Sequence, residues 1–192
     1  MNECLLKAPP RRESAQMRAV GAAQTASRPG LPDSGSAAPY FGKDFDFLHG
    51  QWLVENRRLA EPLGRPEDWI GFDTIHSCRS ILNGAGHLEE TASEDGASWA
   101  TLRLLDPRNR RWTVHCISPL DGTLRTPLTG TFESGVGTFV GEDTWRGRTV
   151  RLRETWLRTT AKPRWELAFS LDGGATWNEC WLRDFTRVYW PL

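Results

Sequence analysis

Carboxylate and guanidinium side chains recur in this sequence on extended segments that also carry tryptophan. Glu89 and Glu154 are the candidate catalytic residues, because a carboxylate desolvated between indole rings favours its acid form, as a general acid or base at neutral pH requires. Arg58 or Arg103 in the same interior would neutralise a carboxylate or bind an anionic ligand bidentately. A third interpretation is a buried ladder of ion pairs with no chemistry. The residues alone leave all three open.

Short extended segments separated by turn formers must position these groups. Glycine, proline, aspartate and asparagine divide the chain after residue 50, as in Asn83-Gly84 and Asp172-Gly173-Gly174. Connections this short pair each strand antiparallel with the next, and closure into a barrel removes the two open edges. The predicted strands are 51–59, 69–82, 86–93, 98–106, 111–118, 124–133, 137–146, 149–159, 163–171 and 176–188. The fold class is therefore all-β, a single up-and-down antiparallel barrel of about ten strands.

The tryptophans indicate which face of each strand points inward. The chain holds 10 Trp, and side chains alternate between the two faces of a strand, so the phase that carries Trp is the predicted interior. A single bulge would reverse the assignment beyond it. That phase also carries Asp73, Arg79 and Asp143. The predicted ligand-binding residues are Asn56, Arg58, Arg103, Trp112, Trp145, Glu154, Trp156 and Trp181.

Composition limits the classes of partner. Lys+Arg and Asp+Glu are 24 each, so the charge balance favours neither nucleic acid nor an anionic membrane. No segment approaches the roughly 20 apolar residues of a membrane helix. Four separated cysteines predict free thiols and a cytoplasmic protein, and a Cys78–Cys180 disulfide would need an oxidising compartment. The oligomeric state is left open.

Residues 1–40 and 41–192 form two regions of different character. The first is rich in Ala, Pro, Ser, Gly and Arg and is predicted to be a disordered tail, because it cannot bury enough apolar surface to offset its ordering entropy. The second is the barrel domain. At its start, Asp44 is expected to cap one helical turn that carries Phe45 and Leu48 as a plug.

Residues 170–177 match the Asp-box pattern Ser-x-Asp-x-Gly-x-Thr-Trp of sialidase-like propellers. The pattern occurs once, whereas a propeller needs repeated blades. We therefore expect only the hairpin, in which Asp172 accepts hydrogen bonds from the turn.

Several motifs together resemble the lipocalin and calycin superfamily, and more closely an uncharacterised group of bacterial lipocalin-like proteins. They are 46–52 (Asp-Phe-Leu-His-Gly-Gln-Trp), 88–90 (Leu-Glu-Glu), 153–156 (Arg-Glu-Thr-Trp), 165–166 (Trp-Glu) and the final Asp-Gly-Gly-x-Thr-Trp hairpin. The resemblance covers about 43–188 and implies a calycin-type barrel, but it carries over no established catalytic residues. It also implies that Arg187, or alternatively Arg183, stacks on Trp52 and closes one barrel end.

Metal and haem sites are not predicted. Nitrobindins, which are haem-binding barrels, also begin with a Gly-x-Trp strand, but they end with an axial histidine, whereas the last histidine here is His115. His76 and His115 are interpreted as exposed strand residues, and His115-Cys116 is the only adjacent pair of soft ligands. Haem binding is the minor alternative.

These observations favour a barrel that binds a small aromatic or anionic molecule in a tryptophan-lined cavity and needs no cofactor. The main alternative is a cofactor-independent cyclase, isomerase or hydratase in which Glu89 or Glu154 moves a proton. The other is a structural role, with an interior so full of indoles that only a few waters fit.

Overall fold

Ten strands form one sheet in the part of the chain that the structure describes. The structure is a computed structural model, and it describes residues 42–189 except 63–67, 119–120 and 159–161. The strands are β1 (Gly50–Leu59), β2 (Trp69–Ile81), β3 (Gly86–Ser93), β4 (Ser98–Asp106), β5 (Arg111–Ile117), β6 (Leu128–Glu133), β7 (Val136–Trp145), β8 (Arg148–Leu157), β9 (Arg164–Ser170) and β10 (Asn178–Val188). Two short 3-10 turns accompany them, η1 (Asp46–Leu48) and η2 (Leu82–Gly84).

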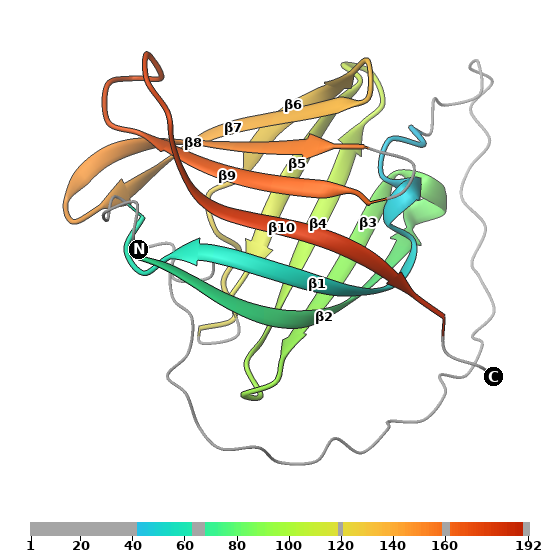
Figure 1. Cartoon of the computed structure of the whole chain (residues 1–192). Helices are drawn as coiled ribbons and strands as arrows, with labels where there is room; N and C mark the ends of the chain where they lie inside the picture. Colours follow the sequence, from blue (N-terminus) through green and yellow to red (C-terminus); the bar gives the residue numbers. More distant parts are fainter. Residues whose placement is uncertain (1–41, 63–67, 119–120, 159–161, 190–192) are drawn as a thin grey trace.

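The sheet is a closed barrel. Each strand pairs antiparallel with its neighbours in the sequence, and β1 also pairs with β10 (Figure 1). In this last pair, Trp52 lies opposite Arg187. Closure removes the two open edges that a flat sheet of these strands would have. The predicted fold is therefore confirmed. The largest difference in bounds is at β6, which begins at Leu128 rather than 124, where only an isolated bridge from Leu124 to Ile117 is present.

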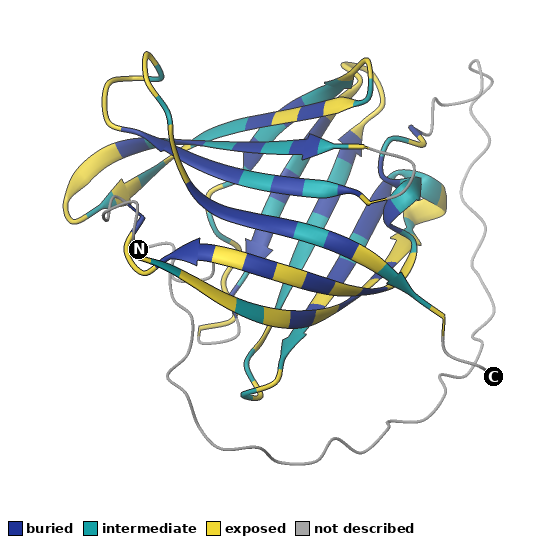
Figure 2. Cartoon of the chain, viewed as in Figure 1, coloured by how far each residue is buried: buried dark blue, intermediate teal, exposed yellow. Residues whose placement is uncertain are grey.

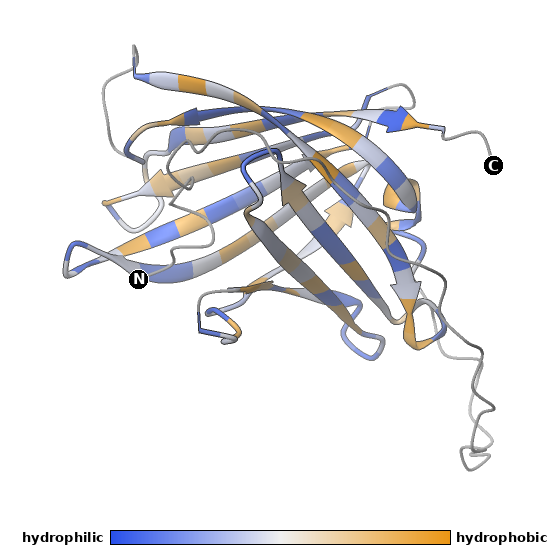
Figure 3. Ribbon diagram, turned by 90° about the horizontal axis from the view of Figure 1, so that it is seen from below, coloured by the Kyte–Doolittle hydropathy of each residue, from blue (hydrophilic) through white to orange (hydrophobic). Residues whose placement is uncertain are grey.

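Side chains alternate between a buried and an exposed face along most strands (Figure 2). Figure 3 shows the same alternation as bands of hydropathy. On β1, Trp52, Val54, Asn56 and Arg58 are all buried, as the tryptophan phase predicts. The interior is therefore shared between apolar, aromatic and charged side chains.

On β2 the predicted inward phase is wrong. Thr74, His76 and Cys78 are buried, whereas Asp73 and Arg79 are exposed. The assignment relied on Trp69, which is the first residue of the strand and only half-buried, on the phase opposite to the interior. A terminal tryptophan therefore did not report the face of the strand.

β10 contains the kind of irregularity that shifts the inward phase. Its register against β9 shifts between Glu179 and Trp181, and the four consecutive residues from Cys180 to Arg183 are buried. Before the shift, Glu179 is exposed, although it shares the phase of Trp181. Beyond it, Trp181, Arg183 and Phe185 follow the predicted phase.

Two of the cysteines, Cys78 and Cys180, are buried free thiols, and burial raises the pKa of Cys78 to about 12. Cys116 is disulfide-bonded, so the prediction of four free thiols is wrong at that position.

Aromatic residues around η1 close one end of the barrel. Phe45, which is fully buried, packs edge-on against Trp112 and Phe132 with ring centroids 5.0 Å apart in both cases. The expected plug is therefore present, but the expected cap is not. Instead of capping the turn, the Asp44 carboxylate accepts a hydrogen bond of 2.9 Å from Trp112 Nε1.

Arg187 fastens this plug to the barrel. Its guanidinium lies 4.1 Å from the centre of the Trp52 ring and donates hydrogen bonds to the carbonyls of His49 and Phe47. Gly50 makes this approach possible: its φ is 109°, and a Cβ there would lie 2.8 Å from Arg187 Nη1. The predicted stacking is thus confirmed for Arg187 rather than Arg183.

The hairpin at 170–177 has the predicted structural role. Asp172 accepts hydrogen bonds from the backbone and hydroxyl of Thr176 and from the Ser170 hydroxyl, which hold the pKa of the Asp172 carboxyl well below its usual value.

We expect Arg187→Ala to destabilise the protein by about 2–4 kcal/mol, because it removes one cation–π contact and two charge-assisted hydrogen bonds to the plug. Urea unfolding followed by far-UV circular dichroism measures this loss. Arg57→Ala, on the exposed face of β1, is the control and should change stability by less than about 0.5 kcal/mol. Equal effects of the two substitutions would show that Arg187 does not fasten the plug.

Candidate functional site

A set of polar side chains lies buried in the barrel interior. Within the described residues it comprises Asn56, Arg58, Thr74, His76, Glu89, Thr91, Arg103, Glu154 and Arg183, none more than 6 % exposed. Burial of so many polar groups is costly unless they are paired. Their pairing therefore decides what the interior can do.

One side of the set is a directed chain of hydrogen bonds across β10, β1 and β2. Trp181 Nε1 donates to Asn56 Oδ1 at 3.0 Å, and Asn56 Nδ2 donates to Thr74 Oγ1 at 2.9 Å. Because Thr74 Oγ1 accepts that bond, its own hydroxyl proton is free to point at His76 Nε2, which lies 2.9 Å away. The chain therefore assigns Nε2 of His76 as the unprotonated nitrogen.

The chain ends at Glu89. His76 Nδ1 lies 2.5 Å from Glu89 Oε1, and Arg103 Nη2 donates to Glu89 Oε2 at 2.5 Å. Although burial alone would raise the pKa of the Glu89 carboxyl, the Arg103 charge and the His76 hydrogen bond hold it well below its usual value. Burial also lowers the pKa of His76, so a neutral imidazole donates to an ionised carboxylate.

Arg103 connects Glu89 to the aromatic residues that form the floor of the barrel around Phe45. Its guanidinium carbon lies 4.9 Å from the Phe45 ring centre and 5.4 Å from that of Trp156. Nε and Nη1 have no hydrogen-bond partner within the described residues. Arg103 is thus paired with Glu89 through Nη2, while its Nε and Nη1 donors have no described acceptor.

Glu154 behaves differently from Glu89. Its Oε1 accepts a hydrogen bond of 2.6 Å from Trp156 Nε1, but burial outweighs this bond and the nearby arginine charges, so the pKa of Glu154 is raised. Burial therefore shifts the pKa of Glu154 in the direction expected for a carboxylate among indoles.

Arg183 lies against two indoles. Its guanidinium carbon is 4.1 Å from the ring centres of both Trp165 and Trp181. Burial lowers the pKa of Arg183 to about 10, which still leaves it charged at neutral pH. Its Nε and Nη2 find no hydrogen-bond partner in the described part of the chain.

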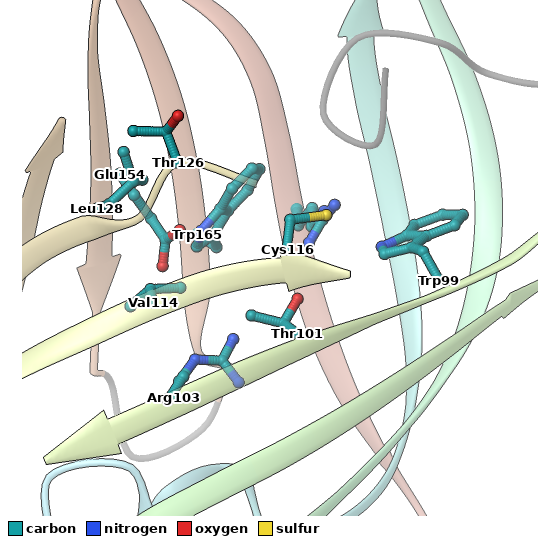
Figure 4. A pocket seen from close by; sticks show the side chains of 10 residues that line it. Trp99, Thr101, Arg103, Val114, Cys116, Thr126, Leu128, Glu154 and Trp165 are labelled. Atoms are coloured by element: carbon teal, nitrogen blue, oxygen red, sulfur yellow. The ribbon is translucent and has the colours of Figure 1, made fainter. Parts of the chain in front are cut away.

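A small cavity lies between these groups and the barrel end opposite the plug. Its volume is about 20 Å³, enough for roughly one water. Figure 4 shows the labelled side chains around it, among them Arg103 and Glu154 deep in the barrel and Trp99 to one side. The lining residues are Trp99, Thr101, Arg103, Val114, Cys116, Thr126, Leu128, Glu154, Trp165 and Arg183.

The predicted site residues occupy three different places. Arg103 and Glu154 line the cavity. Asn56, Arg58 and Trp181 lie next to it, since Trp181 packs on Arg183 and its ring centre is 5.7 Å from the Arg58 guanidinium.

The remaining predicted residues lie farther from the cavity. Trp112 and Trp156 belong to the aromatic floor around Phe45, with Trp156 reaching Glu154 through its indole nitrogen. Trp145 is the last residue of β7, half-buried, and is not among the lining residues.

The predicted set omits Arg183, Trp99, Trp165 and His76. The first three belong to the tryptophan phase that predicts the interior, so their signal was present. His76 was interpreted as exposed because the β2 phase was reversed, and this is wrong, since His76 is 0 % exposed. Both of its ring nitrogens are engaged, which leaves neither open as an axial haem ligand.

No protein-family model matches this sequence, and the search of curated proteins returns no match either. Within the described residues no helix is long and apolar enough to cross a membrane.

We expect Glu89→Gln to destabilise the barrel by about 3–5 kcal/mol, because it leaves the buried Arg103 charge without its carboxylate. Glu90→Gln is the matched control, since Glu90 is the next residue on β3 and is exposed. Chemical unfolding at pH 7 should show less than about 0.5 kcal/mol for this control. A loss of similar size in both variants would contradict a central role for the Glu89–Arg103 pair.

Proposed function

We propose that the barrel binds a small anionic molecule whose acid group lies between Arg103 and Arg183. The observation that carries this proposal is the pair of buried guanidinium groups lining one cavity, each with N–H donors that no described acceptor satisfies. Buried donors of this kind are normally paired, and carboxylate or phosphate oxygens fit a guanidinium best.

The charged groups on the cavity support the same ligand. Arg103 and Arg183 both line it, together with one carboxyl group, that of Glu154, whose pKa is raised by burial. An acid group bound there would interact with both guanidinium groups in a medium of low dielectric constant.

The size of the cavity limits how the ligand is held. A space for about one water admits an inorganic anion or a single acid group only with some movement of the lining. Trp99 is half-buried and lines the cavity, so its displacement would enlarge the site. We infer that the body of the ligand packs against Trp99 and Trp165, whose indoles suit a planar ring.

In this proposal, most of the other predicted binding residues hold the two arginines in position rather than contact the ligand. Trp181 packs against Arg183, and Asn56 fixes the Trp181 indole through a hydrogen bond. Trp156 contacts both Arg103 and Glu154. Trp112 supports the floor, and Trp145 has no role in the proposed site.

The proposal includes membership of the lipocalin-like group. Three observations support it: the closed antiparallel barrel, the Gly50-Gln51-Trp52 start of β1, and the stacking of Arg187 on Trp52. Lipocalin-type barrels of this size hold one small ligand at most.

Binding can be tested by titrating the full chain with benzoate, phosphate and uncharged benzamide, followed by tryptophan fluorescence and calorimetry. We expect an anion to bind and benzamide not to bind. Arg183→Met should weaken anion binding by about 10- to 100-fold, the loss of one charge-assisted hydrogen bond or two. Arg153→Met is the control, because Arg153 also stacks on an indole, that of Trp177 at 4.5 Å, but does not line the cavity.

The binding proposal is wrong if no anion binds and native mass spectra of the purified protein show no small molecule. The barrel would then have a structural role. In that case the arginines and indoles fill the interior and have no ligand.

A second candidate function is proton transfer by Glu154 to or from a bound molecule, in a cyclase, isomerase or hydratase. The raised pKa of Glu154 and its place on the cavity favour it over Glu89, whose carboxylate is engaged by His76 and Arg103. We expect Glu154→Gln to abolish turnover of any substrate found while keeping anion affinity within about threefold. Equal turnover by the variant would reject Glu154 as the acid or base.

A further inference from the structure

A second group of chemically active side chains lies at the plugged end of the barrel, apart from the cavity. Asp46 belongs to η1, His49 follows that turn, and His87 is the second residue of β3. The ligand atoms of all three lie within 4.8 Å of one another. They come from segments far apart in the sequence that the plug brings together.

We propose that Asp46, His49 and His87 form a binding site for a divalent transition-metal ion. Asp46 Oδ1 lies 3.7 Å from His49 Nε2 and 3.8 Å from His87 Nε2. Two ligands of a tetrahedral zinc ion, with bonds of about 2.0–2.1 Å, lie about 3.4 Å apart. Both distances from Asp46 are within a few tenths of an ångström of that value, and all three ligand atoms lie within 4.8 Å of one another, so the two histidines must still adjust to share one ion.

The strongest support comes from His87. Its side chain is 0 % exposed, yet neither Nδ1 nor Nε2 has a hydrogen-bond partner within the described residues. A fully buried imidazole with two unsatisfied nitrogens is rare in native proteins. His49 Nε2 is also buried and unpaired. An ion would satisfy the two Nε2 atoms that face the Asp46 carboxylate.

The donor set suits a transition metal. A metal binds the neutral imidazole of histidine and an ionised carboxylate. Two imidazoles and one carboxylate favour zinc, iron, cobalt or nickel over magnesium or calcium, which prefer oxygen ligands alone. Three protein ligands leave at least one position for water or another ligand.

The surrounding structure fixes the backbone of one ligand residue and leaves the site open to solvent. Arg187 donates to the His49 carbonyl, which fixes the backbone of that residue at the end of the plug. Asp46 and His49 are half-buried, so an ion can reach the site from solvent.

Ion binding requires a change in one contact. The rings of His49 and His87 stack at 4.7 Å with an angle of 18° between their planes. The lone pairs of stacked rings run in parallel planes, so at least the half-buried His49 ring must turn for both nitrogens to meet one ion. Binding should therefore alter the stacked pair and link η1 to β3.

The test is a titration of the metal-free full chain with Zn²⁺ against a chromophoric chelator, together with Co²⁺ absorption spectra. We expect one equivalent of Zn²⁺, a Co²⁺ spectrum of low coordination number and a higher melting temperature with Zn²⁺. Mg²⁺ should not compete. His49→Ala and Asp46→Asn should each weaken Zn²⁺ binding by at least about tenfold.

His115→Ala is the matched control, because His115 is a half-buried histidine on β5 outside this group. Its zinc affinity should equal that of the unmodified chain. His49 and Asp46 are half-buried, so their variants should keep the far-UV spectrum of the barrel. No zinc uptake, unchanged affinity in both ligand variants, or loss of binding in His115→Ala would each overturn the proposal. The result is independent of anion binding, which the ligand variants should retain.

Discussion

The Glu89–Arg103 ion pair is the interaction on which the interior of this barrel depends. It joins β3 to β4 at the level where the aromatic floor ends and the cavity begins. Three further side chains contact the pair. His76 completes the coordination of the carboxylate, while Phe45 and Trp156 receive the guanidinium. A buried pair of this quality contributes little net stability over an apolar core, but losing one member is severe. The pair therefore contributes more to the fixed positions of the buried side chains around it than to the net stability of the fold.

The bonding partners explain why the pKa values of the two buried carboxyls shift in opposite directions. Arg103 and His76 both contact Glu89 at hydrogen-bond distance and hold its pKa down despite burial. Glu154 receives an indole hydrogen bond but remains dominated by desolvation. The pKa values of the two carboxyls are thus shifted in opposite directions, and only Glu154, whose pKa is raised, lines the cavity. Arg183, held between indoles rather than by a carboxylate, supplies the unpaired positive charge there.

Much of the fold could be predicted from the sequence, because turn formers and two-residue alternation are local signals. All ten strands follow the turns, and the Trp phase identifies Asn56, Arg58, Arg103 and Glu154 as interior. The sequence could not reveal which tryptophans mark the inside. Trp69 is the first residue of its strand and lies on the outward phase. The phase of β2 was assigned from it, so His76 was placed on the outer face. The bulge near Cys180 changed the phase of Glu179. Both failures concern register, which long-range pairing determines rather than local composition.

The plugged end shows a different limit. His87 shares the phase of Glu89 on β3, so its burial follows from the alternation, but nothing local brings Asp46 and His49 to it. That meeting depends on Arg187 stacking on Trp52 and holding the carbonyls of the plug, a contact between the first and last strands. Closure of the sheet thus does more than remove its edges, since it places the start of the barrel domain against β3. Among the described residues the barrel thereby holds two chemically distinct groups, guanidinium N–H donors without a partner on the cavity and imidazole nitrogens without a partner beside the plug.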